Sequence, residues 1–366
     1  AHIARSGRNA AVLAAWAQGP QAGAAALRAA LGASGVEPPD TAALAWGQVM
    51  GSDEADALEI VERALGDAVA AGTLLPGRPR WRQAAEALTE QVLTRPLDFP
   101  PGQTLAGMVT TERVGAWIDS ARHPLHREWR SLVANRLLHP VEPPADPAVA
   151  VAPLHWLLEL AARAGGAELT QSNYLARATV LAAVERFGWW RWSKAPRSES
   201  DVHQLGAVRD AATRLRLVRR RGRRLLLTRR GRDLLEEPGR LWAAVAAETE
   251  DSEDFTRMLA ELVGLRLLQG RVEVDGLRAD LTPILAAQGW STSAGPITPN
   301  QLSSAVWRPV GWWRMFGALL EEEPTWEFGT GRRLTPHTLA LDPDGERMVL
   351  AYLRSRAAGP RARFSY

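Results

Sequence analysis

The chain has 366 residues, of which 46% are hydrophobic, and these values exclude wholesale disorder and a single small core. The absence of cysteine excludes a disulfide framework, a thiol nucleophile and thiolate metal sites. A net charge of only +3 excludes a uniformly basic chain, so any affinity for a polyanion must come from a local cluster of charge.

The N-terminal region contains Arg5 and Arg8 followed by an apolar stretch at 10–17. This stretch ends at Gln18-Gly19-Pro20 and is too short for a good secretory signal, so it predicts the first turns of an amphipathic helix. No apolar run approaches the roughly 20 residues that span a bilayer, and we expect a cytoplasmic protein without membrane contact.

Proline-rich segments interrupt the chain at 37–40, 95–102 and 140–147. Proline lacks a backbone donor and disfavours helix in the preceding residue, so each segment ends an element. Helical periodicity precedes the third segment at 53–71, 112–118 and 125–138, with Leu58, Val61, Leu65 and Val69 on one face of the first helix. We therefore predict a mostly helical N-terminal domain over residues 1–145.

After this predicted linker, three sequence landmarks recur in the same order at offsets of 101 to 107 residues. Landmarks in one order at one spacing indicate a tandem duplication of a unit of about 105 residues. The recurring pairs are Glu159-Leu160 with Glu261-Leu262, Leu181-Ala182-Ala183 with Leu285-Ala286-Ala287 together with the Gly-Trp pairs that follow them, and Leu227-Thr228 with Leu334-Thr335.

In each copy the sequence predicts helices, then a β-hairpin, then a last helix. This is the order of elements in a winged helix. The first copy, over 150–250, predicts helices at 153–163, 174–187, 200–216 and 238–247, strands at 217–220 and 223–227, and a helix capped by Thr228. The second, over 255–366, predicts a helix at 311–322, a hairpin at 325–335 and a helix at 346–356 that the turn at 342–345 introduces. The expected fold class is α+β, mainly helical with small hairpins.

Three segments resemble a known group of proteins: 169–175, 225–232 and 238–242, together with the ending at 351–361. They are similar to the C-terminal region of uncharacterised actinobacterial proteins, some of which carry a plasmid ORF-3-like domain. The resemblance covers about residues 150 to 360 and implies the fold, but it brings no activity with it.

The predicted hairpin of the first copy carries an unusual concentration of positive charge. Residues 219–232 read RRRGRRLLLTRRGR, and residues 189–232 hold fourteen basic side chains against three acidic ones. Gly222 suits the tip of such a hairpin, because a tight turn needs a residue that tolerates positive φ. Either this is a phosphate-binding wing or it is a solvated arginine face.

For DNA binding we expect contacts from the basic residues of this region and from the start of the helix that precedes the hairpin. That helix has a buried arc of Val202, Leu205, Val208, Ala212 and Leu215, and its exposed arc contains Asp210, which would repel phosphates. The reading of bases should therefore be weak. The candidate nucleic-acid-binding residues are Arg191, Lys194, His203, Gln204, Arg209, Arg214, Arg219, Arg220, Arg221, Arg223, Arg224, Arg229 and Arg230.

The corresponding helix of the second copy carries Trp312, Trp313 and Phe316, and Glu321-Glu322-Glu323 follows it. Apolar side chains beside acidic ones suit a protein contact or packing between the two copies, and these three aromatic residues are predicted to bind a partner. The 15 tryptophans of the chain could also stack on unpaired bases near Trp189, Trp190 and Trp192, although packing is their commoner use.

No linear signature of an enzyme is present. The single lysine, Lys194, follows no glycine-rich loop, and neither a dinucleotide fingerprint nor a nucleophile elbow occurs. His123, His126 and His139 lack thiolate support for a metal, and 342–346 suits a helix-capping turn better than a calcium loop. We expect neither metal nor cofactor.

The leading hypothesis is a double-stranded DNA-binding protein, weakly sequence-specific and open to a regulatory role, whose second winged helix docks on a partner or another copy. The alternative is an assembly protein whose winged helices bind protein only. A DNA-acting enzyme such as a glycosylase or nuclease is a third class, because carboxylate-based enzymes can lack a linear motif.

Overall fold

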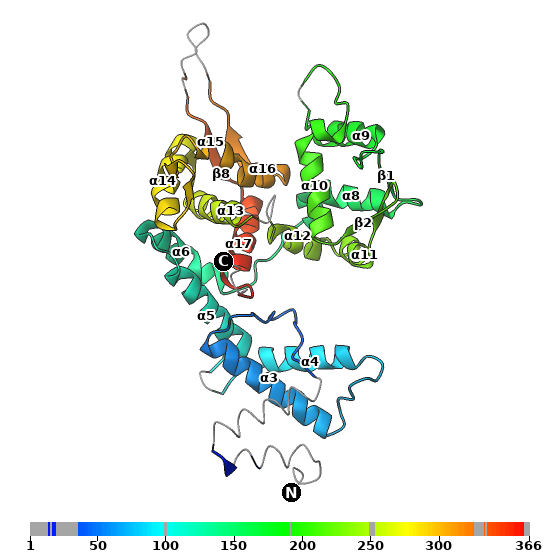
Figure 1. The fold of residues 1–366 in the computed structure, drawn as a ribbon, viewed down its shortest axis with the longest axis vertical. Helices are drawn as coiled ribbons and strands as arrows, with labels where there is room; N and C mark the ends of the chain where they lie inside the picture. Colours follow the sequence, from blue (N-terminus) through cyan, green and yellow to red (C-terminus); the bar gives the residue numbers. More distant parts are fainter. Residues whose placement is uncertain are drawn as a thin grey trace. The chain divides into compact units, whose positions relative to one another are not determined.

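The computed structural model describes residues 14, 17–19, 36–98, 101–190, 192–248, 253–325, 333 and 335–361. The chain forms two compact units, one of residues 1–116 with 358–366 and one of residues 117–357 (Figure 1). The contacts thus divide the chain at residue 117 and not in the proline-rich segment at 140–147.

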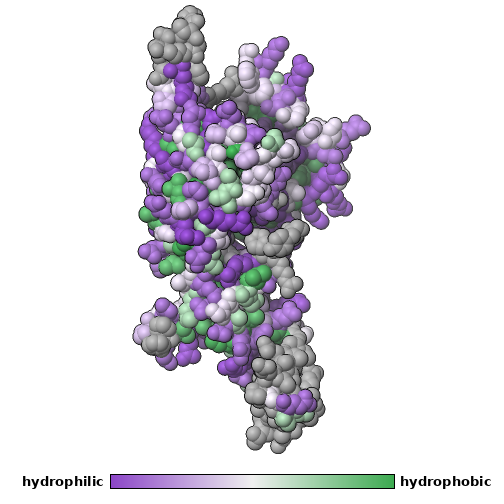
Figure 2. All heavy atoms as spheres, turned by 60° about the vertical axis from the view of Figure 1, so that its left-hand side comes forward, coloured by the Kyte–Doolittle hydropathy of each residue, from purple (hydrophilic) through white to green (hydrophobic). Residues whose placement is uncertain are grey.

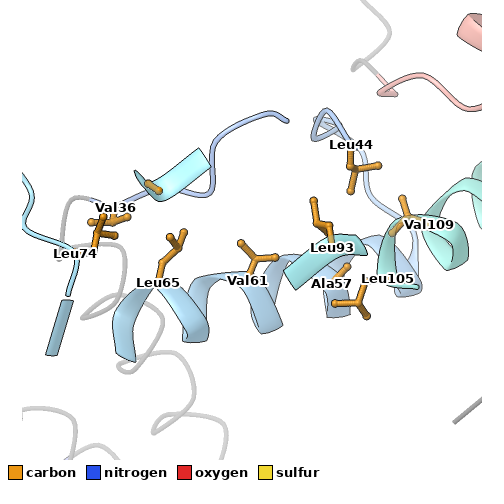
Figure 3. Close-up of a cluster of buried hydrophobic side chains, with 10 residues drawn as sticks. Val36, Leu44, Ala57, Val61, Leu65, Leu74, Leu93, Leu105 and Val109 are labelled. Atoms are coloured by element: carbon orange, nitrogen blue, oxygen red, sulfur yellow. The ribbon is translucent and has the colours of Figure 1, made fainter. Parts of the chain in front are cut away.

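Over its described residues from 36 onwards, the first unit contains the helices α3 (Ser52–Ala70), α4 (Trp81–Thr94) and α5 (Leu105–Asp119), the last of which ends just inside the second unit. Val61 and Leu65 of α3 pack in a core with Leu93 of α4 (Figure 3). All three are fully buried. The predicted apolar face of the first helix is therefore confirmed at its centre, and helix α4 was missed by periodicity alone.

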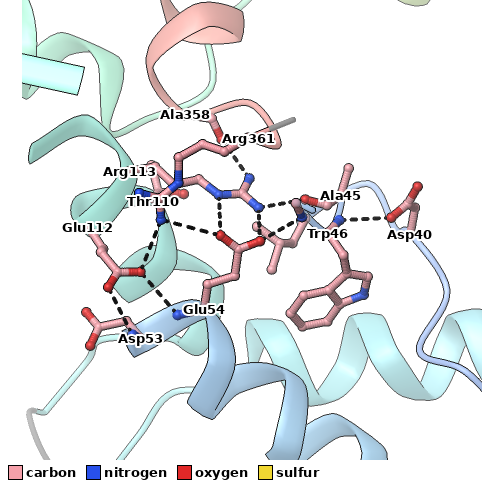
Figure 4. Close-up of polar contacts among 12 residues, drawn as sticks. Asp40, Ala45, Trp46, Asp53, Glu54, Thr110, Glu112, Arg113, Ala358 and Arg361 are labelled. Carbon is pink, nitrogen blue, oxygen red and sulfur yellow. Dashed lines mark hydrogen bonds and ion pairs between the residues drawn. The ribbon is translucent and has the colours of Figure 1, made fainter. Parts of the chain in front are cut away.

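A buried ion pair holds this unit together (Figure 4). Arg113 of α5 donates through Nε to Glu54 of α3 at 3.0 Å, and both side chains are buried. The same guanidinium donates to the backbone carbonyl groups of Ala45 and Ala358 at 2.8 and 2.9 Å. One buried arginine thus bonds to helix α3, to the segment before it at Ala45 and to the segment at Ala358. These bonds tie the chain after the last helix to the rest of the first unit.

The second unit begins with α6 (Pro124–Leu137) and α7 (Pro147–Ala150) and then contains two halves, in each of which helices and a short strand precede a hairpin and a helix follows it. The first half comprises α8 (Ala152–Ala162), β1 (Ala167–Glu168), α9 (Arg177–Phe187), η2 (Glu199–Asp201), α10 (His203–Arg214), β2 (Val218–Arg221), β3 (Arg224–Leu227), α11 (Arg229–Glu236) and α12 (Pro238–Ala246). The second half comprises α13 (Asp254–Leu267), β4 (Val272–Glu273), α14 (Val274–Ala287), β5 (Ser291–Thr292), β6 (Gly295–Pro296), α15 (Leu302–Ala305), α16 (Trp307–Met315), β7 (Leu319–Glu322), β8 (Thr338–Leu341) and α17 (Pro343–Ala357).

Each half has a three-stranded antiparallel sheet with one topology. The strand order is β1-β3-β2 in the first half and β4-β8-β7 in the second, so the second hairpin strand lies in the middle in both. A further two-stranded sheet pairs β5 with β6. The fold is therefore helical with small antiparallel sheets, as the α+β prediction expects.

The helix after the central strand begins in the same way in both halves. The backbone N–H of Gly231 donates to Thr228 Oγ1 at 2.9 Å, and that of Gly345 donates to Asp342 Oδ1 at 2.6 Å. Each glycine lies so close to the residue before the first hairpin strand that a Cβ would overlap a carbonyl oxygen, of Leu217 or of Ala318. The predicted cap at Thr228 is confirmed. Asp342 caps a helix as expected of the turn at 342–345, but α17 begins at Pro343 and not at the predicted residue 346.

The second half differs from the sequence prediction at its hairpin. Residues 319–322 form strand β7 and not the end of a helix, because α16 ends at Met315. The partner strand β8 starts at Thr338, after the predicted hairpin at 325–335, most of which lies outside the described residues. The landmark Leu334-Thr335 therefore does not correspond to Leu227-Thr228, because the loop between the two strands is longer here than the two-residue turn of the first half.

Helix α6 is fixed to the second half by a buried cluster of charges. Glu261 Oε1 of α13 accepts from Arg130 Nε at 2.8 Å and contacts His126 Nε2 at 3.0 Å, while Arg356 of α17 lies 3.7 Å from Oε2. Burial alone would raise the pKa of Glu261, but the charge of Arg130 and the hydrogen bond to His126 outweigh it and lower this pKa to about 2. Burial lowers the pKa of His126, and a neutral ring fits its contacts, with Nδ1 accepting from Gln288 at 3.1 Å.

Hydrophilic side chains cover most of the described surface on the face drawn in Figure 2, and hydrophobic ones are scattered among them. Among the described residues, no helix has the length and apolar character that crossing a bilayer requires. The same residues contain no group of three or more histidine, aspartate or glutamate side chains placed to hold a metal ion.

Candidate nucleic-acid interface

The candidate interface is the hairpin formed by β2 and β3, which we call the arginine wing and define as residues 218–227. Its two strands pair from Val218 with Leu227 to Arg221 with Arg224, and Gly222 at the turn has a φ of 58°. Only glycine adopts this φ readily, which confirms the predicted role of Gly222. Val218 and Leu225 are buried, so apolar side chains anchor the wing to the core.

The register of the wing places three guanidinium groups on one face. Arg221 lies opposite Arg224, and Arg219 lies one strand step before Arg221, opposite Leu226. Since alternate residues of a strand point to opposite faces, Arg219, Arg221 and Arg224 share a face. All three are exposed, and no described carboxylate pairs with them. Such a surface carries positive charge that only an outside anion can neutralise.

The other predicted contacts around the wing are also exposed but are less uniform. Arg220 points to the opposite face, and Arg223 Nε donates to the carbonyl of Leu169 at 3.2 Å, which fixes the turn against the strand β1 region. Lys194, Arg229 and Arg230 are exposed as well. Strand β1 was missed, because two residues give no alternation pattern, although the glycine pair that precedes it is a turn signal.

Arg209, in contrast, is used inside the fold. Its guanidinium contacts Glu199 at 3.0 Å and the carbonyl of Asn173 at 2.8 Å, and it lies over the ring of Tyr174. Burial raises the pKa of Glu199. The hydrogen bond from the backbone N–H of Leu175 and the charge of Arg209 lower this pKa, but burial outweighs them. Arg209 therefore stabilises the loop before α9 and has little charge to offer a phosphate.

The helix α10 that precedes the wing buries the predicted arc, including Val202, Leu205 and Val208. Its first residues, His203 and Gln204, line a cleft that faces the second half of the unit. Asp210 is exposed and Arg214 lies 3.7 Å from Glu248. The candidate base-reading residues His203 and Gln204 thus lie apart from the arginine wing. Arg191, which was also predicted to bind nucleic acid, lies outside the described residues.

The aromatic residues predicted to bind a partner are part of the core. Trp312, Trp313 and Phe316 are 2%, 1% and 7% exposed. Trp312 packs edge-on against Phe316, and Trp313 packs in the same way against Tyr352 of α17. The sequence expectation fails here because these three side chains pack into the core, so apolar residues next to acidic ones do not mark a surface.

Comparison with known proteins gives one match. The family model of the Y4jL N-terminal domain matches residues 148–240, which is less than half of the chain. The matched residues run from α7 through the arginine wing to the start of α12. No curated protein and no solved structure matches the chain. The matched region overlaps the first part of the stretch that resembles the plasmid ORF-3-like group.

Proposed function

We propose that this protein binds double-stranded DNA through the arginine wing. The observation that carries the proposal is the shared face of Arg219, Arg221 and Arg224, three exposed guanidinium groups without a described carboxylate partner. Guanidinium groups form paired hydrogen bonds with phosphate oxygens, and concentrated positive charge gains affinity by releasing counterions from DNA.

The topology supports a pair of winged helices as the scaffold. In each half several helices precede a hairpin, and a short strand pairs with the second strand of that hairpin. In winged-helix proteins the helix before the hairpin enters the major groove and the wing contacts the backbone. We propose this mode for the first half only.

Contacts of this kind hold a duplex without reading its sequence. The exposed side of α10 offers Asp210 and small residues, and His203 and Gln204 are turned to the cleft. Base recognition needs side chains that reach the base edges, whereas phosphate contacts are independent of sequence. The proposed binding is therefore weakly sequence-specific.

The described residues of the second half form no equivalent surface. The strand β7 carries Glu321 and Glu322, which pair with Arg314 and with Arg271, and His337 contacts Glu321. Carboxylates on a wing repel phosphates, so this half serves as support for the first half or as a docking unit for protein.

The test is the affinity for a short labelled duplex, measured by fluorescence anisotropy over a series of salt concentrations. The variant R219A/R221A/R224A should bind roughly 10- to 100-fold more weakly at about 0.1 M salt, and its log–log salt slope should be smaller by about three. A matched control removes three exposed arginines of the first unit, in R78A/R82A/R95A, and should retain the wild-type slope.

If the wing variant and the wild type have the same affinity and slope, the wing does not bind DNA. That result would favour the alternative function, in which the two halves bind protein. The control excludes a general effect of net charge, because both variants lose three positive charges.

A further inference from the structure

The second unit contains a cleft of about 1380 Å³ that both halves line. One wall comes from α7, α8, the end of α9 and the start of α10. The other wall comes from α16, β7 and the first turn of α17. The arginine wing of the same chain does not contribute to this lining.

Aromatic side chains form much of the cleft surface. Trp189 stacks on Phe187 at a centroid distance of 4.8 Å, and the guanidinium of Arg314 lies over the ring of Trp307 at 5.4 Å. Trp192 is 76% exposed, so its ring is open to a ligand. A large exposed indole in a concave site is suited to stacking with a planar or cationic group.

Carboxylates outnumber guanidinium groups in the described lining. The three arginines there are Arg308, Arg314 and Arg347, and the five acidic residues are Asp146, Glu321, Glu323, Asp342 and Asp344. Arg314 already pairs with Glu321, and Arg347 donates to the carbonyl of Pro143.

Three of these carboxylates have no cationic partner among the described residues. Asp146 and Asp342 accept backbone N–H groups at the starts of their helices, and Asp344 lies exposed in the first turn of α17. The negative charge of these three carboxylates is therefore not neutralised by an ion pair among the described residues.

An open indole ring and unpaired carboxylates in the lining of one cleft favour a guanidinium ligand and disfavour nucleic acid. Arginine combines a delocalised positive charge with a flat surface that stacks on tryptophan, whereas phosphates would meet repulsion here. The surface of this protein that best supplies such groups is the arginine wing, which presents five exposed arginines between 219 and 224.

We propose that the cleft binds the arginine wing of a second copy of this chain. Each copy has one wing and one cleft. The contact is therefore heterologous, because the wing of one copy binds the cleft of another. The contact stands independently of the proposed function. If the wing also binds DNA, the two ligands compete for it.

The test measures self-association of the full chain by sedimentation velocity over a wide range of concentration. The wild type should form dimers or larger species that dissociate as salt is raised, because exposed charge pairs are screened. The wing variant R219A/R221A/R224A and the cleft variant W192A/D344N should each sediment as monomers. The control variant R78A/R82A/R95A should associate like the wild type.

A mixing experiment separates this contact from unspecific association. The wing variant retains an intact cleft and the cleft variant retains an intact wing, so an equimolar mixture should form a heterodimer. A wild type that stays monomeric at all concentrations, or a mixture that does not associate, would overturn the proposal.

The same variants distinguish this proposal from the DNA-binding function. The cleft variant should bind duplex DNA at least as tightly as the wild type, because its wing is not occupied. Loss of self-association in this variant with retained DNA binding supports both proposals, whereas a monomeric wild type that binds DNA through the wing refutes only the cleft contact.

Discussion

The two halves of the second unit share a topology and differ in how they use charge. Both place the second hairpin strand in the centre of a three-stranded sheet. In the first half the positive charge lies on an exposed wing, whereas in the second half Glu321 and Glu322 of β7 pair with Arg314 of α16 and with Arg271, which precedes β4. The comparison teaches that one strand order can carry either an exposed cluster of arginines or a set of paired charges.

Glu159 and Glu261 show how far two matching positions can diverge. They occupy the same landmark in the sequence, yet the side chain of Glu159 is 49% exposed beside His155, and that of Glu261 is completely buried beside three cationic or histidine partners. The same residue is therefore a surface group in one half and the centre of a charge cluster in the other.

The largest effect expected from this comparison is on stability. The substitution Glu261→Gln should lower the free energy of unfolding by about 3–5 kcal/mol, because it leaves Arg130 buried without its counter-charge. The matched substitution Glu159→Gln should change it by less than about 1 kcal/mol, as expected for an exposed pair. Urea unfolding followed by circular dichroism measures both, and equal losses would contradict the assigned difference in burial.

The next effect should be alike in the two halves. Gly231→Ala and Gly345→Ala should each destabilise the protein by about 1–3 kcal/mol, because the added methyl group overlaps the carbonyl oxygen of Leu217 or of Ala318. Gly206→Ala, at a helical position with open space around it, is the control and should be neutral or slightly stabilising. A neutral result at one of the two buried glycines would show that the halves do not share this helix start.

The smallest expected effect is the pH dependence of stability. It arises where His126 of α6 contacts Glu261 of the second half. Burial keeps the pKa of His126 below its ordinary value near 6.5, so on acidification the unfolded chain takes up a proton before the folded protein does. Stability should therefore fall as the pH drops below about 6.5, and it should fall further between about pH 4.5 and 2 as Glu261 is protonated.

The variant His126→Gln isolates the first of these two steps. Its unfolding midpoint should no longer decline between about pH 6.5 and 5, whereas the step at lower pH should remain. A decline of unchanged size in the variant would assign the effect to another group.

Residues with strong local preferences made much of the fold predictable. Gly222 predicted the turn of the wing, Thr228 and Asp342 predicted helix starts, and the spacing of Val61 and Leu65 predicted a buried helix face. These features depend on the backbone conformation of a few neighbouring residues, which the sequence encodes directly. The exposure of the wing arginines follows in the same way, because charged side chains on a short hairpin have nowhere else to lie.

Contacts between distant segments decided the rest. Strand β8 was misplaced because a strand is defined by its partners, and the longer loop of the second half moved it beyond the expected residues. The sequence predicted that Trp312 and Trp313 form a docking surface. In the fold both are buried, and Trp313 packs against Tyr352 of α17.

The sequence by itself therefore determined the local elements and the island of positive charge. Only the tertiary structure decided that Arg209 is bound by Glu199, that His203 and Gln204 face a cleft, and that Glu261 is buried while Glu159 is not. The physical reason is that burial and pairing are properties of surfaces brought together by the fold, and two matching sequence positions can meet entirely different neighbours.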